Sequence, residues 1–141
     1  MSRVVNPNAV GKRRKMLLQV LALALRELMT QTSPEQTTRD LAAFLVLTLE
    51  ELAATIHETT DAWEKRGYWV KADRFRLEWE WAGRLAEQLR QALLAEDWEE
   101  VSRVAAALFG HLGSVKLPKR QRPTRPWEGA WAKFVEREGV G

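Results

Sequence analysis

The feature that most constrains this chain is a long helical pattern broken near its middle by one glycine. Between Pro34 and Gly67 there is no glycine and no further proline, and after Gly67 the same three- and four-residue spacing of apolar side chains resumes. The repeating residues are Leu41, Leu45, Leu49, Leu52, Ile56 and Trp63, then Tyr68, Ala72, Phe75, Trp79, Ala82, Ala86, Leu89 and Leu93. This periodicity predicts two long helices, about 34–66 and 68–95, that form an antiparallel hairpin.

Local signals predict where these helices begin and end. Ser33, Pro34 and Gln36 form a start signal, in which Ser33 is the N-cap and Gln36 completes a capping box. Gly67 is expected to end the first long helix as its C′ glycine. Asp97, with Glu100 three residues later, predicts a further helix that ends near Leu112.

The segment from about 12 to 31 is predicted to be a helix that is apolar on almost every side. A helix without a polar face is surrounded by protein, so we expect it at the centre of the bundle or in a subunit interface. Residues 1–11 contain Asn6, Pro7, Asn8 and Gly11, which are turn formers, and are expected to be an arm.

The end of the chain is predicted to be a basic linker followed by a short helix. Three prolines and five bases fall within residues 113–126, and residues 127–138 then resume a helical pattern, with a tail to 141. No stretch alternates with a period of two, so no sheet is expected. The fold class is therefore all-α: an antiparallel four-helix bundle over 12–112, built on the hairpin, with the C-terminal helix on its outside or on a neighbour.

Composition limits the possible functions. The chain has 141 residues and no cysteine, which suits one domain and excludes disulfides, cysteine-ligated zinc and thiol nucleophiles. Its longest apolar run, Met16–Leu25, is half of the roughly 20 residues that span a bilayer, and as a signal peptide it is too short before its cleavage site. We expect a cytoplasmic protein with no membrane contact.

Charge is strongly segregated behind a net charge of +3. Residues 1–26 carry six bases and no acid, residues 116–126 carry five bases and no acid, and residues 27–115 hold 16 acids against 9 bases. Such asymmetry is typical of proteins that contact phosphates. The alternative is that the basic ends dock on the acidic body of the same chain or of another subunit.

No catalytic motif is present. The sequence lacks a glycine-rich phosphate loop, Gly-x-Ser-x-Gly and His-Glu-x-x-His, so we expect no enzyme and no cofactor. His57 and Asp61, with Glu50 and Glu64 on the same side, could form half of a metal site, but we interpret them as an ordinary charged surface. His111 is expected near a helix C-terminus, where a cation is favourable.

Three basic blocks are the predicted nucleic-acid contacts. They comprise Lys12, Arg13, Arg14 and Lys15; then Lys65, Arg66, Trp69, Lys71, Arg74 and Arg76; then Lys116, Lys119, Arg120, Arg122 and Arg125. Because bases at a helix start oppose its dipole, the first block should have an anion nearby, a glutamate of another helix or a phosphate. Trp69 could stack on a nucleobase. The interpretation we favour is that Trp69 packs under the C-terminal helix with Arg76 over its ring.

The C-terminal helix carries a second candidate surface. Its stripe of Trp127, Trp131, Phe134 and Val135 has the aromatic character of a docking anchor. The sequence therefore supports two hypotheses. The first is a non-enzymatic helical protein that grips RNA or DNA backbone, for example as a small subunit of a nucleoprotein complex. The second is a structural or adaptor module that self-associates or docks on a protein partner through its first helix or this C-terminal helix.

Overall fold

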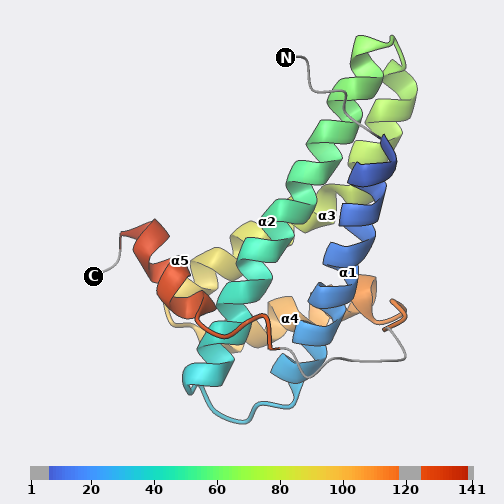
Figure 1. The fold of residues 1–141 in the computed structure, drawn as a ribbon. Coiled ribbons are helices and arrows are strands. Elements are labelled where there is room, and N and C mark those ends of the chain that lie inside the picture. The colour runs from blue at the N-terminus through green and yellow to red at the C-terminus, as the bar shows by residue number, and fades with distance from the viewer. Residues whose placement is uncertain (1–6, 118–124, 140–141) are drawn as a thin grey trace.

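The structure, a computed structural model, describes residues 7–117 and 125–139. Within these ranges it contains five α-helices and no strand, which confirms the all-α class (Figure 1). The helices are α1 (Pro7–Met29), α2 (Gln36–Lys65), α3 (Trp69–Leu94), α4 (Trp98–Leu112) and α5 (Ala130–Glu138). Their packing is that of a helical bundle.

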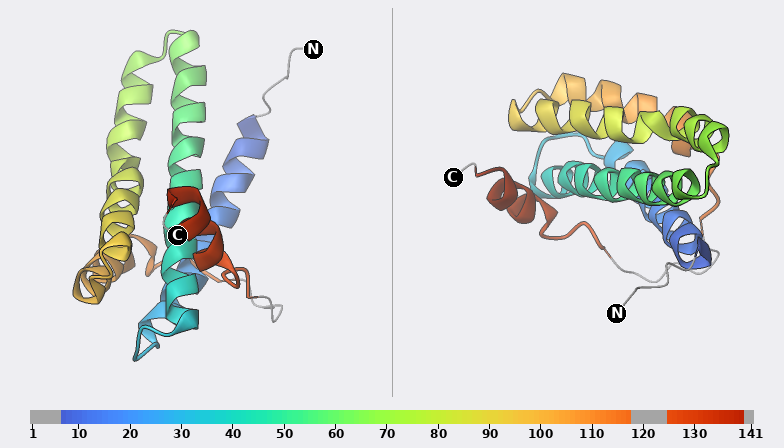
Figure 2. Two further views of the ribbon diagram at one scale, coloured as in Figure 1. Left: turned by 90° about the vertical axis from the view of Figure 1, so that its left-hand side faces the viewer. Right: turned by 90° about the horizontal axis from the view of Figure 1, so that it is seen from above.

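Helix α2 lies at the centre of this arrangement. It runs beside α3 in a hairpin and contacts α1 and α5 on its other faces (Figures 1 and 2). Helix α4 packs on the half of α3 that is lower in Figure 1, and it also contacts α1. The core is correspondingly rich in α2 residues, among them Leu41, Leu45, Leu49 and Leu52, all fully buried. Of the two positions predicted for the first helix, the centre of the bundle is wrong, because α1 lies at the side and exposes Met16 and Met29, while the subunit interface stays a prediction.

The turn between α2 and α3 has the predicted geometry. Gly67 has a φ of +82°, a left-handed conformation that a side chain disfavours. The amide of Tyr68 donates to the carbonyl of Trp63 at 2.9 Å, and the amide of Gly67 donates to Glu64 at 2.9 Å. These two bonds form a Schellman motif, which satisfies the last carbonyls of α2 and reverses the chain within a few residues.

Helix starts differ more from expectation. α1 begins at Pro7, five residues before the predicted start, because proline suits the first position of a helix. The predicted Ser33 cap is wrong: the N-cap of α2 is Glu35, and the carbonyl of Ser33 instead accepts bonds from the amide of Glu35 and the hydroxyl of Thr38. At α4 the predicted cap is confirmed, since the Asp97 carboxylate accepts from the amide of Glu100 at 3.1 Å.

Three tryptophans of the hairpin are buried to different degrees. Trp81 is buried, whereas Trp63 and Trp79 are half-buried. Trp63 of α2 and Phe75 and Trp79 of α3 form a row of aromatic rings. The ring centroids are 5.0 Å apart between Trp63 and Phe75 and 6.1 Å apart between Phe75 and Trp79. His111, in the last turn of α4, stacks flat on Trp81 at 4.3 Å.

Helix α5 packs on α2 of its own chain. Phe134 and Trp127 are buried in the common core, while Trp131 and Val135 are half-buried. The carboxylate of Asp40 on α2 accepts from the backbone amide of Trp131 at 3.0 Å, which supplies the cap that α5 lacks in its own sequence.

The other end of α5 is held by charge. Arg137 bonds Glu50 of α2 at 2.7 Å, and Arg90 of α3 bonds Glu138 at 2.6 Å. The hydrogen bond that Arg137 donates to Glu50, together with the negative charges of Glu50 and Glu138, raises the pKa of Arg137 above its ordinary value. The stripe predicted as a partner-docking surface is therefore occupied within the chain.

Candidate nucleic-acid interface

Two of the three predicted basic blocks converge at the hairpin end of the molecule. The first turns of α1 lie beside the last turns of α2, so that Lys12–Lys15 approach the block around the α2–α3 turn (Figure 1). A cleft of about 230 Å³ joins them, with Val10 and Arg14 from α1 facing Glu58, Trp63 and Arg66 from α2. The fold thus brings together bases that are about 50 residues apart in sequence.

Some of these bases already have partners in the chain. Arg13 bonds Glu58 at 2.9 Å, which is the neighbouring glutamate expected from the helix-dipole argument. Arg76 pairs with Glu64 across the hairpin and with Asp73 at 2.9 Å on its own helix. All three pairs are partly exposed, so they contribute little stability, but they reduce the charge available to a ligand.

Arg14 is a structural residue rather than a surface contact. Its guanidinium donates to the Thr55 carbonyl at 3.1 Å and the Thr59 hydroxyl at 2.6 Å, and it lies 5.0 Å from the centre of the Phe75 ring. It therefore joins three helices. Burial lowers the pKa of Arg14, and the like charge of Arg13 adds to this effect, while Glu58 opposes it.

Six bases of these two blocks remain exposed and form no ion pair with any residue in the described ranges. They are Lys12, Lys15, Lys65, Arg66, Lys71 and Arg74. The ammonium of Lys71 lies 4.4 Å from the centre of the Trp63 ring, an arrangement that keeps its charge at the surface.

The whole end is positively charged. We define the cationic end as residues 7–15 and 58–76, which together contain nine bases and four acids. Residues 77–112, which form the rest of α3 and all of α4, contain three bases and seven acids. Since α2 alone is roughly 45 Å long at ~1.5 Å per residue, the cationic end lies far from the acids at the start of α4, which gives the molecule an electrostatic polarity.

Trp69 lies at the tip of this end and is 61% exposed. The favoured interpretation from the sequence, in which Trp69 packs under the C-terminal helix beneath Arg76, is wrong. α5 docks on α2 away from the hairpin turn, and Arg76 is held by Glu64 (Figure 1). Tyr68 and Val70, the neighbours of Trp69 in the sequence, are also more than half exposed, so the tip combines apolar surface with flanking cations.

The third basic block starts and ends at the opposite end of the molecule. Lys116 and Arg125 are exposed there, and Arg125 lies 3.9 Å from Glu128. Arg26 donates to the Val115 carbonyl at 3.1 Å, which fixes the chain after α4 against α1. Lys119, Arg120 and Arg122 lie outside the described residues. The described part of this block does not join the cationic end.

The surface around His57 offers little to a metal. His57 and Asp61 are exposed, while Glu50 is bonded to Arg137 and Glu64 to Arg76. Among the described residues, no three potential ligands are gathered closely enough to hold an ion. In the same residues, no helix is both long and apolar enough to cross a membrane.

Comparison with known proteins adds no assignment. No family model, no curated protein and no solved structure matches this chain. The function is therefore inferred from the geometry and charge of the cationic end.

Proposed function

We propose that this protein is a non-enzymatic nucleic-acid-binding protein that grips the phosphate backbone with its cationic end. The observation that carries this proposal is the convergence of two basic blocks at one end, with six cations exposed and unmatched by carboxylates of the described residues. Lysine and arginine that meet phosphates release condensed counterions, which provides sequence-independent affinity. A role as a small subunit of a nucleoprotein complex belongs to the same proposal.

The unmatched cations differ in what they can contribute. Lys12 and Lys15 project from α1, whereas Lys65 and Arg66 lie at the end of α2, so one backbone can be held from two elements. Trp69 and Tyr68 add exposed rings, on which unpaired bases can stack. The scaffold we propose is the antiparallel four-helix unit of α1–α4, with α5 as a fifth helix bound to its side.

Fluorescence anisotropy with labelled single-stranded and duplex oligonucleotides tests the proposal. We expect a Lys12→Gln, Lys15→Gln, Lys65→Gln, Arg66→Gln variant to bind at least about tenfold more weakly than the unmodified chain at low salt. All four side chains are exposed, so the fold should be retained.

The matched control is Lys133→Gln, which removes an exposed cation from α5. It should change the affinity by less than about twofold, whereas Lys116→Gln reports on the third block separately. Equal affinity of the four-site variant and the control, or absence of binding by the unmodified chain at low salt, contradicts the proposal.

A second candidate function is self-association as a structural module. The observation that favours it is the exposed apolar surface of the hairpin tip, which no helix of the described chain covers. Contiguous exposed apolar residues rimmed by polar ones are typical of interaction sites.

A further inference from the structure

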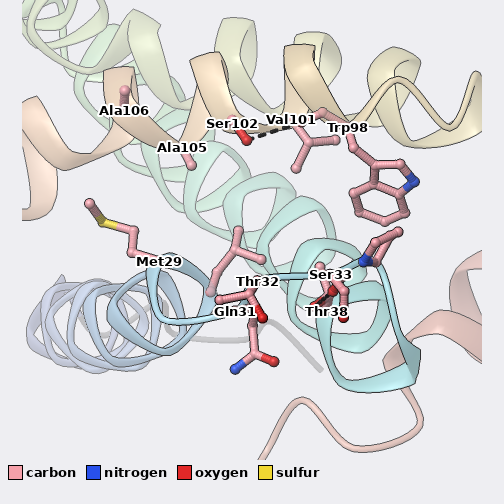
Figure 3. Close-up of a pocket in the computed structure, with 12 residues that line it drawn as sticks. Met29, Gln31, Thr32, Ser33, Thr38, Trp98, Val101, Ser102, Ala105 and Ala106 are labelled. Carbon is pink, nitrogen blue, oxygen red and sulfur yellow. Dashed lines mark hydrogen bonds between the residues drawn. The ribbon is translucent and has the colours of Figure 1, made fainter.

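Two apolar features lie at opposite ends of the molecule. The first is the tip formed by Tyr68, Trp69 and Val70, which we call the apolar tip. The second is a groove of about 360 Å³ between α4 and the chain that connects α1 to α2 (Figure 3). Its volume falls in the lower part of the range of about 300–1,000 Å³ that is typical of specific binding sites.

The groove is lined mainly by apolar side chains. Trp98, Val101 and Ala105 line its α4 side, and Met29 lies across from them (Figure 3). Leu28 of α1 also lines the groove. Its walls come from segments that are far apart in sequence and are held by the core, which makes the groove a preformed feature of the fold.

Two of the four hydroxyl groups that line the groove, those of Thr38 and Ser102, already donate within the chain. Ser102 donates to the carbonyl of Trp98 at 3.1 Å, and Thr38 donates to the carbonyl of Ser33 at 2.7 Å. Their protons are therefore not directed at a ligand. A predominantly apolar side chain fits this lining better than a polar molecule, because few donors would be left to recognise the latter.

Three exposed acidic residues, Glu27, Glu35 and Glu99, are each next in sequence to a residue that lines the groove. None of the three is ion-paired to a described residue, whereas Arg39 is held by Glu96 and by the Trp98 ring, and Arg103 is held by Glu100. The surroundings of the groove are therefore suited to an apolar side chain carried by a basic segment.

The apolar tip has this chemistry. Trp69 is flanked by Lys65, Arg66, Lys71 and Arg74, none of which is matched by a carboxylate of the described residues. We propose that the apolar tip of one copy inserts Trp69 into the groove of a second copy, with the cations of the tip facing Glu27, Glu35 and Glu99. A single contact would then bury both unpartnered apolar surfaces and neutralise both charged rims.

The geometry of this contact determines the kind of assembly. Since tip and groove lie at opposite ends of the chain, one molecule cannot satisfy both by itself, and a pair joined by a single such contact leaves one tip and one groove free. Such a heterologous contact produces open chains or closed rings. The inference develops the second candidate function and does not depend on nucleic-acid binding. Because nucleic acid would use the same cations, adding an oligonucleotide should shift the assembly towards monomers.

Sedimentation velocity over a range of concentrations tests this proposal. We expect the unmodified chain to sediment faster as its concentration rises, and less so at high salt. Trp69→Ser removes the inserted ring, and Ala106→Arg places a cation in the groove at an exposed position of α4. Each should weaken association by about tenfold or more. The matched controls are Leu77→Ser on α3 and Ala107→Arg on α4, both at exposed positions outside the tip and the groove, and both should associate normally.

Mixing the two variants distinguishes this contact from any symmetric one. The Trp69→Ser chain keeps an intact groove and the Ala106→Arg chain keeps an intact tip, so the mixture should form dimers that do not grow further. A monomeric unmodified chain overturns the proposal, as does association that neither variant weakens or a mixture that stays monomeric. Ala106→Arg removes no cation, so loss of its self-association with oligonucleotide binding retained separates this proposal from the proposed function.

Discussion

At the scale of single residues, the hairpin depends on the conformational freedom of Gly67. Its φ of +82° would strain any side chain with a Cβ, although nothing lies within 4 Å of where that atom would be. We expect Gly67→Ala to lower the free energy of unfolding by about 1–2 kcal/mol. Gly110→Ala in α4 is the matched control and should raise it by up to about 1 kcal/mol, since alanine favours a helix interior. Urea denaturation measures both changes, and equal effects of the same sign would contradict this role of Gly67.

Arg14 illustrates a basic residue whose role is structural. Its bonds to Thr55 and Thr59 and its position over Phe75 join three helices, so Arg14→Ala should lower the free energy of unfolding by about 1–2 kcal/mol. Lys15→Ala should change it by less than about 0.5 kcal/mol, because Lys15 is exposed. For oligonucleotide affinity we expect the larger loss from Lys15→Ala. The two variants therefore separate stability from binding, and a larger loss of affinity for Arg14→Ala would refute the assignment.

A signal for this role was present in the sequence. Arg14 shares a helical face with Val10, Leu17 and Leu21, and that face is buried against α2. A base inside an apolar stripe is held within the fold, whereas its neighbours Lys12 and Lys15 lie off the stripe. The run of four bases could therefore have been divided into one structural residue and three surface residues before the structure was known.

At the scale of helices, the position of α5 depends on residues contributed by α2 and α3. Asp40 supplies the cap that the start of α5 lacks, through a bond of 3.0 Å to the amide of Trp131. We expect Asp40→Ala to cost about 1 kcal/mol and to increase hydrogen exchange in 130–138 more than elsewhere. Asp61→Ala, an exposed change on the same helix, should leave that exchange unaltered. Uniform loss of protection along the chain would count against local control of α5 by Asp40.

The hairpin could be predicted from sequence because its signals are local. An apolar stripe spaced at three and four residues requires a helix, and Gly67 supplies the only backbone freedom between two such stripes. The central position of α2 could not be predicted in the same way. α1 is apolar on more sides, but contacts with α3 and α5 depend on which faces meet in space, and these place α2 between them.

The candidate site was predictable only in part. The basic residues were visible in the sequence, but their division between two ends depends on the long hairpin, which carries 65–74 away from the chain around 116 and 125 (Figure 1). Pairing with carboxylates is also a property of the folded chain. Arg13 and Arg76 form ion pairs with glutamates of α2 and are therefore less available to a ligand. No local sequence pattern reveals this pairing.

At the scale of the whole molecule, charge and apolar surface are both polarised along the hairpin. The cationic end contains nine bases and four acids, and the opposite end combines the groove with nearby acids and with the described part of the third basic block. A polyanion is therefore expected to bind at the cationic end. This polarity also gives each copy two unlike ends, which is the condition for head-to-tail contact.

The salt dependence of oligonucleotide binding tests the central claim most directly. Each phosphate contact on duplex nucleic acid contributes about 0.9 to the slope of log affinity against log salt. If the cationic end grips the backbone, the slope should become shallower by about 0.9 for each productive cation removed among Lys12, Lys15, Lys65 and Arg66, and should not change for Lys133→Gln. A slope that is the same in all these variants would place the nucleic acid elsewhere and contradict the account.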